Sequence, residues 1–356
     1  MSVQKCNLLV IVESFSTGVY AVVRDIVCNL DQNTFEILLL HSLRDDSPAD
    51  YQKDFEQSNI RLQYLPMGSA ASYLPAVKAI KQAIKEFNPD CIHVHSSKAG
   101  FLGRLAAHKT TGRLFYTPHG ISFIRTDVGS LKKSVFYFLE RFIQWYTPSR
   151  MIAVSEAELA NVKRLTNNST VIANFIPVAA IKQHTSFDSA VVGITGRITP
   201  AKNPPLFNRI AALLPSVSFL WVGDGENRSE ITEPNITISG QISRNDALQR
   251  LAEFAIYIQT SNWEGMPIAL LEAMGAGLPV IATRIPAHLN LIEDGINGII
   301  CDVDNEKQFA DAITALLADP KRQKMLGSNA RKTVLEKHNI EQAIANYTAE
   351  YLGLND

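Results

Sequence analysis

Ser261-Asn-Trp-Glu-Gly-Met-Pro-Ile-Ala-Leu-Leu-Glu-Ala-Met-Gly-Ala-Gly-Leu-Pro-Val-Ile-Ala-Thr283 is the stretch that decides the fold of this chain. It contains two carboxylates, Glu264 and Glu272, separated by seven residues across a predicted junction between a loop and a helix. Pro267 fits the first position of that helix, because the N–H that proline lacks is not needed there. The helix is predicted to continue over residues 268–274, and the glycines that follow predict its end.

Apolar runs flank this helix on both sides. Residues 254–260 predict a buried strand before it, and residues 278–282 predict another after it. A strand, loop, helix and strand in this order form a unit of a parallel sheet, in which loops at the carboxyl ends of strands border the ligand crevice. The backbone amides of Gly265, Met266 and Ile268 would lie at the amino end of the helix, a position that favours anions. The stretch therefore predicts a site for a polar, phosphorylated ligand.

The order of residues in this stretch also indicates a family. A Glu, seven residues, a second Glu and then Ala-Met-x-x-Gly-x-Pro-Val-Ile-Ala resembles the donor-site motif of glycosyltransferase family 4. Further landmarks of that family recur in order over nearly the whole chain. The resemblance implies a GT-B fold, in which two doubly wound, Rossmann-like α/β domains face a central cleft.

The resemblance also implies roles for the residues of the stretch. Glu264 would contact the donor sugar as a catalytic-site residue. Residues 265–268, Pro267 included, would hold the hydroxyls and the phosphate of the donor. Glu272, in the second turn, would accept hydrogen bonds from the ribose. From the residues alone, the alternative is that both glutamates are solvated charges at a helix end.

Composition sets the class of protein. With 46% apolar and 19% charged residues, the 356-residue chain is predicted to be globular and to contain two domains. Its net charge of −1 gives no overall attraction to nucleic acid. Its apolar runs are too short to span a bilayer, and no secretion signal is expected before the first predicted strand. The four cysteines lack the spacing of a metal site and are expected to be reduced thiols of a cytoplasmic protein.

Strands alternate with helices along both halves, which predicts two parallel sheets. The predicted strands are 7–12, 35–41, 60–65, 91–95, 114–117, 151–154, 170–173, 191–195, 217–222, 236–238, 255–259, 280–282 and 298–300. Residues 174–190 carry little regular signal and are interpreted as a linker. We therefore expect an acceptor-binding domain over 1–180 and a donor-binding domain over 187–339. In the family fold the last helix returns to the first domain, so residues 340–356 are expected to do so.

A second loop of the C-terminal half carries two cations. Gly196, Arg197 and Lys202 follow the predicted strand 191–195. The guanidinium and the ammonium can together neutralise a diphosphate, the first by bidentate contact and the second as a point charge. The family has an Arg and a Lys at this spacing, which implies that both act on the departing nucleotide diphosphate and that Gly196 lies against the donor. The alternative is a pair of surface cations in a loop.

Two turns in the N-terminal half match further family positions. Gly18 follows the first predicted strand and lets the backbone approach a ligand closely. The family usually has two glycines where this chain has Thr17-Gly18, and a tight turn without a ligand is the alternative. His119 precedes Gly120 at the end of another predicted strand and matches a family histidine near the donor sugar. We expect His119 to act in the catalytic site by hydrogen bonding and not as a proton carrier.

Two patterns resemble sites of other enzyme classes. Gly223-Asp-Gly225 begins like a dinucleotide fingerprint, but Arg228 stands where the third glycine belongs. The family instead implies that Gly225 and the backbone around Ile242 lie near the donor nucleotide. Asp302-Val-Asp304 resembles the metal-binding carboxylates of the other large glycosyltransferase fold. Because Asp304 directly precedes a predicted helix, an N-cap role is favoured, and we predict neither a catalytic metal nor another cofactor.

The segment around His95 resembles bacterial polysaccharide enzymes of this family. His93 and His95 share one strand face, so a metal pair is an alternative there, although no third ligand is evident. We favour Ser96 or Ser97 as the cap of the next helix. Lys98 is then expected to face the acceptor.

Residues 131–146 are basic at one end and rich in aromatic side chains. A core helix is favoured, because several apolar residues recur at helical spacing. These are Val135, Leu139, Phe142, Ile143 and Tyr146. The surplus aromatics Phe136, Phe138 and Trp145 leave a helix at a membrane interface as the alternative.

Together these features predict a cytoplasmic, retaining glycosyltransferase that needs no metal. It would move a hexose-type sugar from a nucleotide diphosphate sugar, with UDP expected before GDP, to a glycan acceptor. The acceptor is expected to be a lipid-linked O-antigen, capsule or exopolysaccharide intermediate, which would require peripheral contact with the cytoplasmic face of the inner membrane. Nucleic acid is not an expected partner, and retention is implied by the resemblance alone.

Three other classes of protein stay open. A nucleotide-sugar epimerase of the same fold would convert the donor without any acceptor. A non-catalytic sugar-nucleotide-binding protein would bind the donor and never release free nucleotide. A dehydrogenase would need the dinucleotide fingerprint, which this chain lacks.

Overall fold

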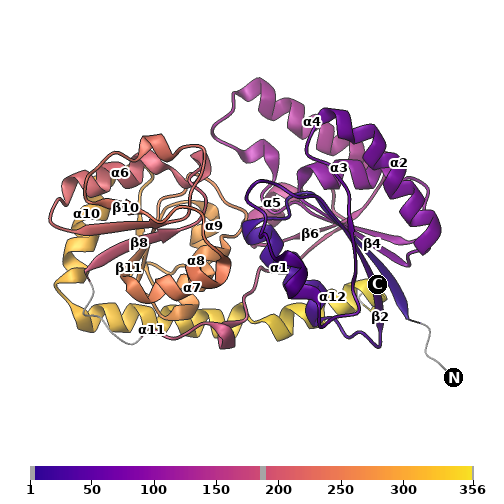
Figure 1. Cartoon of the computed structure of the whole chain (residues 1–356). Coiled ribbons are helices and arrows are strands. Elements are labelled where there is room, and N and C mark those ends of the chain that lie inside the picture. The colour runs from indigo at the N-terminus through magenta and orange to yellow at the C-terminus, as the bar shows by residue number, and fades with distance from the viewer. Residues whose placement is uncertain (1–4, 185–189, 355–356) are drawn as a thin grey trace. The chain divides into compact units, whose positions relative to one another are not determined.

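The computed structural model describes residues 5–184 and 190–354 (Figure 1). The chain divides into two compact units: Met1–Asn174 with Glu341–Asp356 forms the first, and Phe175–Ile340 forms the second. The first unit therefore ends six residues before position 180, the predicted end of the first domain. Of the predicted linker, Thr185, Ser186, Asp188 and Ser189 lie outside the described residues.

The first unit contains a seven-stranded sheet in the order β3-β2-β1-β4-β5-β6-β7. Its strands are β1 (Cys6–Val12), β2 (Phe35–His41), β3 (Arg61–Tyr64), β4 (Cys91–His95), β5 (Arg113–Thr117), β6 (Arg150–Ala153) and β7 (Ser169–Val171). Its helices are α1 (Thr17–Asn29), α2 (Ala70–Phe87), α3 (Ser97–Ala106), α4 (Ser130–Tyr146), α5 (Glu156–Val162) and α12 (Ile340–Leu352). All strand pairs of this sheet are parallel, as the alternation of strands and helices predicts.

The second unit repeats this plan with a six-stranded sheet in the order β10-β9-β8-β11-β12-β13. Its strands are β8 (Val191–Thr195), β9 (Ser218–Val222), β10 (Ile236–Ile238), β11 (Phe254–Gln259), β12 (Val280–Thr283) and β13 (Ile299–Cys301). Its helices are α6 (Pro204–Leu213), α7 (Arg244–Arg250), α8 (Ile268–Ala276), α9 (Pro286–Leu289), α10 (Glu306–Leu317) and α11 (Pro320–Lys337). Here too every strand pair is parallel.

Continuous apolar sequence explains why these strands lie inside their units. A parallel sheet carries helices on both faces, so its central strands are buried on both sides. Residues 8–12 of β1 are at most 1% exposed, and every residue of β11 is buried. Helix α8 is apolar on nearly all sides and is likewise buried along its length. The predicted α/β class with two doubly wound sheets is confirmed.

Helix α12 returns to the first unit, although it follows the whole second unit in sequence. The Tyr351 hydroxyl lies 2.6 Å from Nδ1 of His93 on β4, and the Cys91 thiol donates to the Tyr351 carbonyl oxygen at 3.0 Å. Arg150 Nε lies 2.6 Å from a carboxylate oxygen of Glu350. The C-terminal segment is therefore held to the first sheet by buried polar contacts as well as by packing.

Several predicted helix ends differ by one or two positions. Pro267 is the N-cap of α8 and not its first residue, and Gly277, with φ +83°, is the C-cap. Asp304 is not the cap of α10: Asn305 is, because its side chain accepts from the Gln308 amide. Asp304 instead accepts hydrogen bonds from neighbouring side chains, Asn203 and Arg209. Residue type alone could not show that Asp304 contacts neighbouring side chains and does not cap the helix.

The prediction for the cap of α3 was right in position and wrong in mechanism. Ser96 occupies the N-cap position, but its hydroxyl makes no capping hydrogen bond. Its φ of 71° lies in the left-handed region. Ser97 begins the helix, and its hydroxyl lies 2.7 Å from that of Ser122.

Helix α4 is oriented differently from the core helix predicted for residues 131–146. Its buried residues are Glu140, Ile143 and Gln144, so the prediction of burial is confirmed for Ile143. It is wrong for the other four positions, Val135, Leu139, Phe142 and Tyr146. Apolar spacing alone could not show that a buried arginine of α3 draws the polar face inward. No helix among the described residues has the length and apolarity needed to cross a bilayer.

We predict that Gly223→Ala destabilises the second unit. Gly223 has φ +139°, and a Cβ there would lie 2.2 Å from the carbonyl oxygen of Gly196. The cost should be ~2 kcal/mol or more, because backbone must move and the new residue is strained. Urea denaturation followed by circular dichroism measures it. The control is Gly68→Ala, since a Cβ at exposed Gly68 meets nothing within 4 Å; equal midpoints for the two variants would contradict the close packing of these loops.

Candidate functional site

The predicted donor-site residues meet at the point where the order of the second sheet reverses. From β8 the chain proceeds to β9 and β10 on one side, and from β11 to β12 and β13 on the other. Ligands of such sheets bind beside the carboxyl ends of the strands at this switch point. The loop after β8 carries Lys202, and the loop after β11 carries Glu264.

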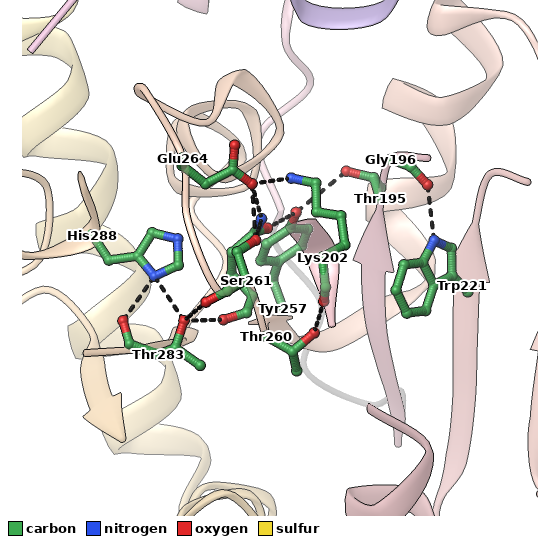
Figure 2. A network of polar contacts seen from close by, with 11 residues as sticks. Thr195, Gly196, Lys202, Trp221, Tyr257, Thr260, Ser261, Glu264, Thr283 and His288 are labelled. Atoms are coloured by element: carbon green, nitrogen blue, oxygen red, sulfur yellow. Dashed lines mark hydrogen bonds and ion pairs between the residues drawn. The ribbon is translucent and has the colours of Figure 1, made fainter. Parts of the chain in front are cut away.

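Glu264 is the centre of a group of polar side chains (Figure 2). Its Oε1 accepts hydrogen bonds from Lys202 Nζ and Ser261 Oγ, both at 2.8 Å, and from Gln259 Nε2 at 3.3 Å. The side chains of Lys202 and Glu264 are only 14% and 17% exposed. The structure thus brings together two of the four predicted catalytic residues, in an ion pair of fixed geometry.

A chain of buried hydrogen bonds leads from β11 to the Glu264 carboxylate. Tyr257 donates its hydroxyl hydrogen to Gln259 Oε1 at 2.7 Å, and Gln259 Nε2 donates to Ser261 Oγ at 2.8 Å. Burial raises the pKa of Tyr257, so its hydroxyl stays protonated. Sequence analysis missed Tyr257 and Gln259; the signal was their alternation on one face of an otherwise apolar strand.

The loop that carries Lys202 is fastened to the loop after β11. Thr260 Oγ1 donates to the Lys202 carbonyl oxygen at 2.6 Å, and the Asn262 amide donates to the Ala201 carbonyl oxygen at 2.8 Å. Asn203, with φ +54°, caps α6 and donates its side-chain amide to Asn262 Oδ1 at 3.0 Å. These bonds fix the backbone on both sides of the ion pair of Lys202 and Glu264.

Arg197 lies on the same loop but beside a different partner. Its Nη2 is 4.0 Å from Glu226 Oε1, and its side chain is about one third exposed. Gly196, before it, has φ +129°, and its carbonyl oxygen accepts from Trp221 Nε1 at 2.8 Å (Figure 2). The structure therefore places Gly196 at the switch point and leaves the role of Arg197 toward a diphosphate as a prediction.

Glu272 is held by an arginine that sequence analysis did not consider. Arg244, the first residue of α7, donates to Glu272 Oε1 from Nε at 2.9 Å and from Nη2 at 2.6 Å. Arg244 follows Ile242, the position predicted to lie near the nucleotide base, by two residues. Glu272 is 9% exposed. A nearly buried carboxylate with a charged partner is suited to accept hydrogen bonds from ligand hydroxyls in a fixed direction.

The amino end of α8 lies between these two glutamates in sequence. Gly265, Met266, Pro267 and Ile268 are all buried, and the Leu271 amide donates back to the Pro267 carbonyl oxygen. The first amides of a helix have no acceptor within it and carry its partial positive charge. Such a helix end favours anions, and contact between these residues and a donor phosphate stays a prediction.

Gly225 has a structural reason to be glycine. A Cβ there would lie 2.3 Å from the Ile198 carbonyl oxygen, in the loop that also carries Arg197. The Ile198 amide donates to the Asp224 carbonyl oxygen at 3.0 Å. The loops after β8 and β9 thus pack backbone against backbone, and a contact between Gly225 and the donor stays a prediction.

The turn after β5 carries His119, which is predicted to act in the catalytic site. His119 follows β5 with φ 56°, a strained conformation for a histidine, and its Nε2 lies 3.0 Å from Nδ1 of buried His95. Gly120 donates its amide hydrogen to Glu158 Oε1 at 2.6 Å, which fixes the turn. Burial lowers the pKa of His119 to about 3, and the pKa of His95 also lies well below its ordinary value. Both imidazoles are neutral at neutral pH and can act as hydrogen-bonding groups.

Gly18 lies in the first turn of α1, directly after Thr17 with φ 47°. Nearby at the end of β1, buried Glu13 accepts from Arg44 Nη2 at 2.5 Å and from Lys98 Nζ at 3.2 Å. Lys98, predicted to face the acceptor, therefore has its ammonium on a buried carboxylate. This cluster of charges is a feature of the first unit that residue types alone did not reveal.

His288 is a further buried group beside Glu264 that sequence analysis missed. Its Nδ1 lies 2.8 Å from the Thr283 carbonyl oxygen, so this nitrogen carries the hydrogen and donates it (Figure 2). Within the described part of the chain, its Nε2 has no hydrogen-bond partner. Burial lowers the pKa of His288 to about 4, and the ring is therefore neutral.

In residues 5–184 and 190–354, no group of three or more His, Cys, Asp or Glu side chains is arranged to hold a metal ion. The pair His93 and His95 is engaged otherwise. His93 contacts Tyr351 through Nδ1 and, at 2.9 Å, Thr117 through Nε2. Its ring therefore serves the packing of α12 on the first sheet.

Two family models match the chain in succession. The model described as Glycosyltransferase Family 4 matches residues 16–180, and the model described as Glycosyl transferases group 1 matches residues 179–333. The chain belongs to this family of glycosyltransferases. The paired glutamates and the Lys202 loop all lie in the part that matches the group 1 model, which confirms the family resemblance of the opening stretch.

This glycosyltransferase is similar to proteins named for a diphosphoundecaprenol-linked sugar and for capsular polysaccharide biosynthesis. It is 26% identical over 330 residues to the UDP-Gal:alpha-D-GlcNAc-diphosphoundecaprenol alpha-1,3-galactosyltransferase of Escherichia coli, covering 82% of this chain and 83% of that protein. It is 24% identical over 333 residues to the capsular polysaccharide biosynthesis glycosyltransferase CapM of Staphylococcus aureus, covering 84% and 85%.

Solved structures share the fold of this glycosyltransferase. Anabaena HepE, in complex with UDP and glucose, superposes with a TM-score of 0.82 at 21% identity, over 98% of this chain and 99% of that chain. Sucrose-phosphate synthase from Thermosynechococcus elongatus superposes with a TM-score of 0.83 at 18% identity, over 98% and 99%. The predicted GT-B architecture of two Rossmann-like units is confirmed.

We predict that stability falls as pH falls through the range in which unfolded histidines titrate. Burial lowers the pKa of His288 and His41 from 6.5 to about 4, so the unfolded chain binds more protons between these values. Stability present above 6.5 is then lost on acidification, by up to ~1.4 kcal/mol per histidine per pH unit. Urea denaturation at about pH 7, 6 and 5 measures the slope. His288→Gln should flatten it, and an unchanged slope would contradict the buried, neutral state.

Proposed function

We propose that this glycosyltransferase moves a sugar from a UDP-sugar to a lipid-linked glycan, with retention and without a metal. The observation that carries the proposal is the ion pair of Lys202 and Glu264 at the sheet's switch point, 2.8 Å between Nζ and Oε1. In this proposal the pair supplies a cation for the phosphate and, beside it, a carboxylate for the sugar. The anion-binding end of α8 follows directly in the chain.

The chemistry requires stabilisation of a departing diphosphate. When the bond between the anomeric carbon and the phosphate oxygen breaks, negative charge grows on the phosphates. Lys202, the amide groups at the start of α8 and Arg197 would oppose that charge, and such fixed groups act strongly in a site that excludes water. Glu264 would orient the sugar and stabilise positive charge at its anomeric carbon.

Retention follows if the acceptor attacks from the face that the diphosphate leaves. The acceptor oxygen forms the new bond to the anomeric carbon, and its proton passes to an oxygen of the departing phosphate. No protein base is needed on the opposite face. His119, neutral and held by His95 at 3.0 Å, is suited to hydrogen-bond the sugar.

Two observations support UDP before GDP as the donor nucleotide. The relative from Escherichia coli is named for UDP-Gal, and the HepE structure contains UDP. In this chain Glu272, fixed by Arg244, would accept hydrogen bonds from the ribose hydroxyls. The backbone near Ile242 leads directly into α7 and would lie beside the base.

The names of relatives support the acceptor class. One is named for a diphosphoundecaprenol acceptor and another for capsular polysaccharide biosynthesis. An O-antigen, capsule or exopolysaccharide intermediate on a polyprenyl diphosphate is therefore the proposed acceptor. Such an acceptor would place the reaction at the cytoplasmic face of the inner membrane, where the enzyme would bind peripherally.

Nucleotide binding is the first test. We expect calorimetry in the presence of EDTA to show binding of UDP in preference to GDP. Glu272→Ala should weaken it by roughly 10- to 150-fold, because a hydrogen bond to a charged group contributes ~1.5–3 kcal/mol. Glu253→Ala, on the surface beside Arg250, is the matched control. If neither nucleotide binds, or if both variants bind UDP equally, the proposed donor site is wrong.

Turnover is the second test. Lys202→Ala should lower the rate of UDP release in the presence of glycan acceptors at least ~100-fold, because a preorganised cation is lost from the departing diphosphate. Lys324→Ala, at an exposed position of α11, should keep the wild-type rate. Wild-type turnover by Lys202→Ala would exclude the mechanism. Donor conversion without acceptor would indicate an epimerase, and UDP-sugar binding with no release of UDP a binding protein.

A further inference from the structure

Helix α4 buries polar side chains and turns apolar ones outward. Arg104 of α3 is fully buried, and its Nη2 lies 2.5 Å from Glu140 Oε2 on α4. Gln144, one turn later, accepts from Arg104 Nη1 at 3.3 Å. The Tyr116 hydroxyl donates to Glu140 Oε1 at 3.0 Å, and the Arg104 guanidinium carbon lies 4.0 Å from the centre of the Tyr116 ring.

This buried group sets the rotation of α4 about its axis. An arginine without a partner inside the unit would cost several kcal/mol, so Glu140 must face inward to meet it. The residues on the opposite side of the helix must then face outward. Figure 1 shows α4 beside α3, with the strands of the first sheet below both helices in this view.

The outward side forms an apolar surface that we name the α4 stripe. Its residues recur every three or four positions and therefore lie along one side of the helix. They are Leu131, Val135, Phe138, Leu139, Phe142 and Trp145. Three of these are largely exposed: Leu131 at 80%, Phe138 at 66% and Trp145 at 75%. A single exposed apolar residue is ordinary, but a row of large ones on one helix indicates a docking surface.

Part of the α4 stripe borders a hollow in the surface of about 530 Å³. Its apolar lining is Phe138, Phe142 and Trp145 from the helix and Pro148 and Leu165 from neighbouring segments, and its polar lining is Arg141, Gln144 and Thr166. The rings of Phe142 and Trp145 lie 6.0 Å apart between centroids. The stripe is thus continuous with apolar surface beside it and offers room for small apolar groups such as acyl chain segments.

The solvent-accessible charged side chains of α4 are all positive. Lys132, Lys133 and Arg141 have solvent-accessible side chains, whereas Glu140, the one acid of α4, is buried with Arg104. Arg164, over the Tyr137 ring of α4, adds another exposed cation. The nearby exposed acid Asp127 is paired with Arg125. A chain of net charge −1 therefore presents a local positive surface around the stripe.

We propose that the α4 stripe docks into the interfacial layer of a bilayer that contains anionic phospholipid. Aromatic and aliphatic side chains with flanking lysine and arginine are the composition of helices that lie in this layer. The cations meet lipid headgroups, and Phe138, Phe142 and Trp145 enter the boundary with the acyl chains. A second copy of the chain fits less well, because a two-fold contact would bring Lys132, Lys133 and Arg141 near their own equivalents. The inference rests on the geometry of α4 and does not depend on the donor.

Co-sedimentation with vesicles tests the docking surface. The full chain should sediment with vesicles of phosphatidylcholine and phosphatidylglycerol at low salt, and less with phosphatidylcholine alone. The double variant Phe138→Ser with Trp145→Ser should lower partitioning at least ~10-fold, because two large apolar side chains no longer enter the interface. Leu74→Ser is the matched control: Leu74 is 75% exposed on α2 and lies outside the stripe.

A charge variant separates the electrostatic contribution to membrane binding from the apolar contribution. Lys132→Ala with Lys133→Ala should weaken binding to the anionic vesicles about 25-fold, about 5-fold per lysine, and change binding to phosphatidylcholine little. Lys81→Ala with Lys85→Ala, on exposed positions of α2, is the control of equal charge. Circular dichroism on every variant tests whether the units stay folded. UDP calorimetry on the same variants measures donor binding separately from membrane binding.

Three results would overturn the proposal. The first is no sedimentation of the full chain with anionic vesicles at low salt. The second is wild-type sedimentation of the Phe138→Ser, Trp145→Ser variant. The third is a dimer, seen by analytical ultracentrifugation, that this variant abolishes, since the stripe would then be an interface between copies of the chain.

Discussion

The parallel direction of every described strand pair is the constraint on which the candidate donor site depends. Parallel strands all end at the same edge of a sheet, so the loops after β8 and β11 are neighbours because their strands are. Lys202 and Glu264 are 62 residues apart in sequence and 2.8 Å apart in space for this reason. The order of the strands already brings the two loops close together, and the hydrogen bonds of Thr260 and Asn262 then fix their positions.

Much of the fold could be predicted from the sequence because buried parallel strands are apolar throughout and stand out from the helices between them. The sequence singles out Glu264, Glu272 and Lys202 because their spacing resembles a family motif, and the structure brings Lys202 and Glu264 into contact. Arg244 and Gln259 could not be singled out, because each acts through one contact that the packing of distant segments creates. A single arginine or glutamine in a sequence does not show which carboxylate it will meet.

Helix α4 shows a different limit. Its apolar residues have helical spacing, and that spacing fits an inward or an outward apolar face equally well. Arg104 decides between them from another helix, since its buried guanidinium requires Glu140. The prediction of a core helix was therefore wrong because the buried charge of Arg104 requires a partner on α4. Hydrophobicity along residues 131–146 carries no information about that charge.

The charges of the donor site balance within the protein. Glu264 is paired with Lys202, and Glu272 with Arg244, so these four side chains together carry no net charge. Pairing lets charged groups remain ionised where water is scarce, since an unpaired ion there would be costly. It also means that the two pairs by themselves exert little long-range attraction on an anion. In the proposed mechanism, attraction to a diphosphate would then come from the amino end of α8 and from Arg197, whose side chain is about one third exposed. Lys202 and Arg244 would contribute at short range, by sharing their hydrogen bonds between a glutamate and the donor.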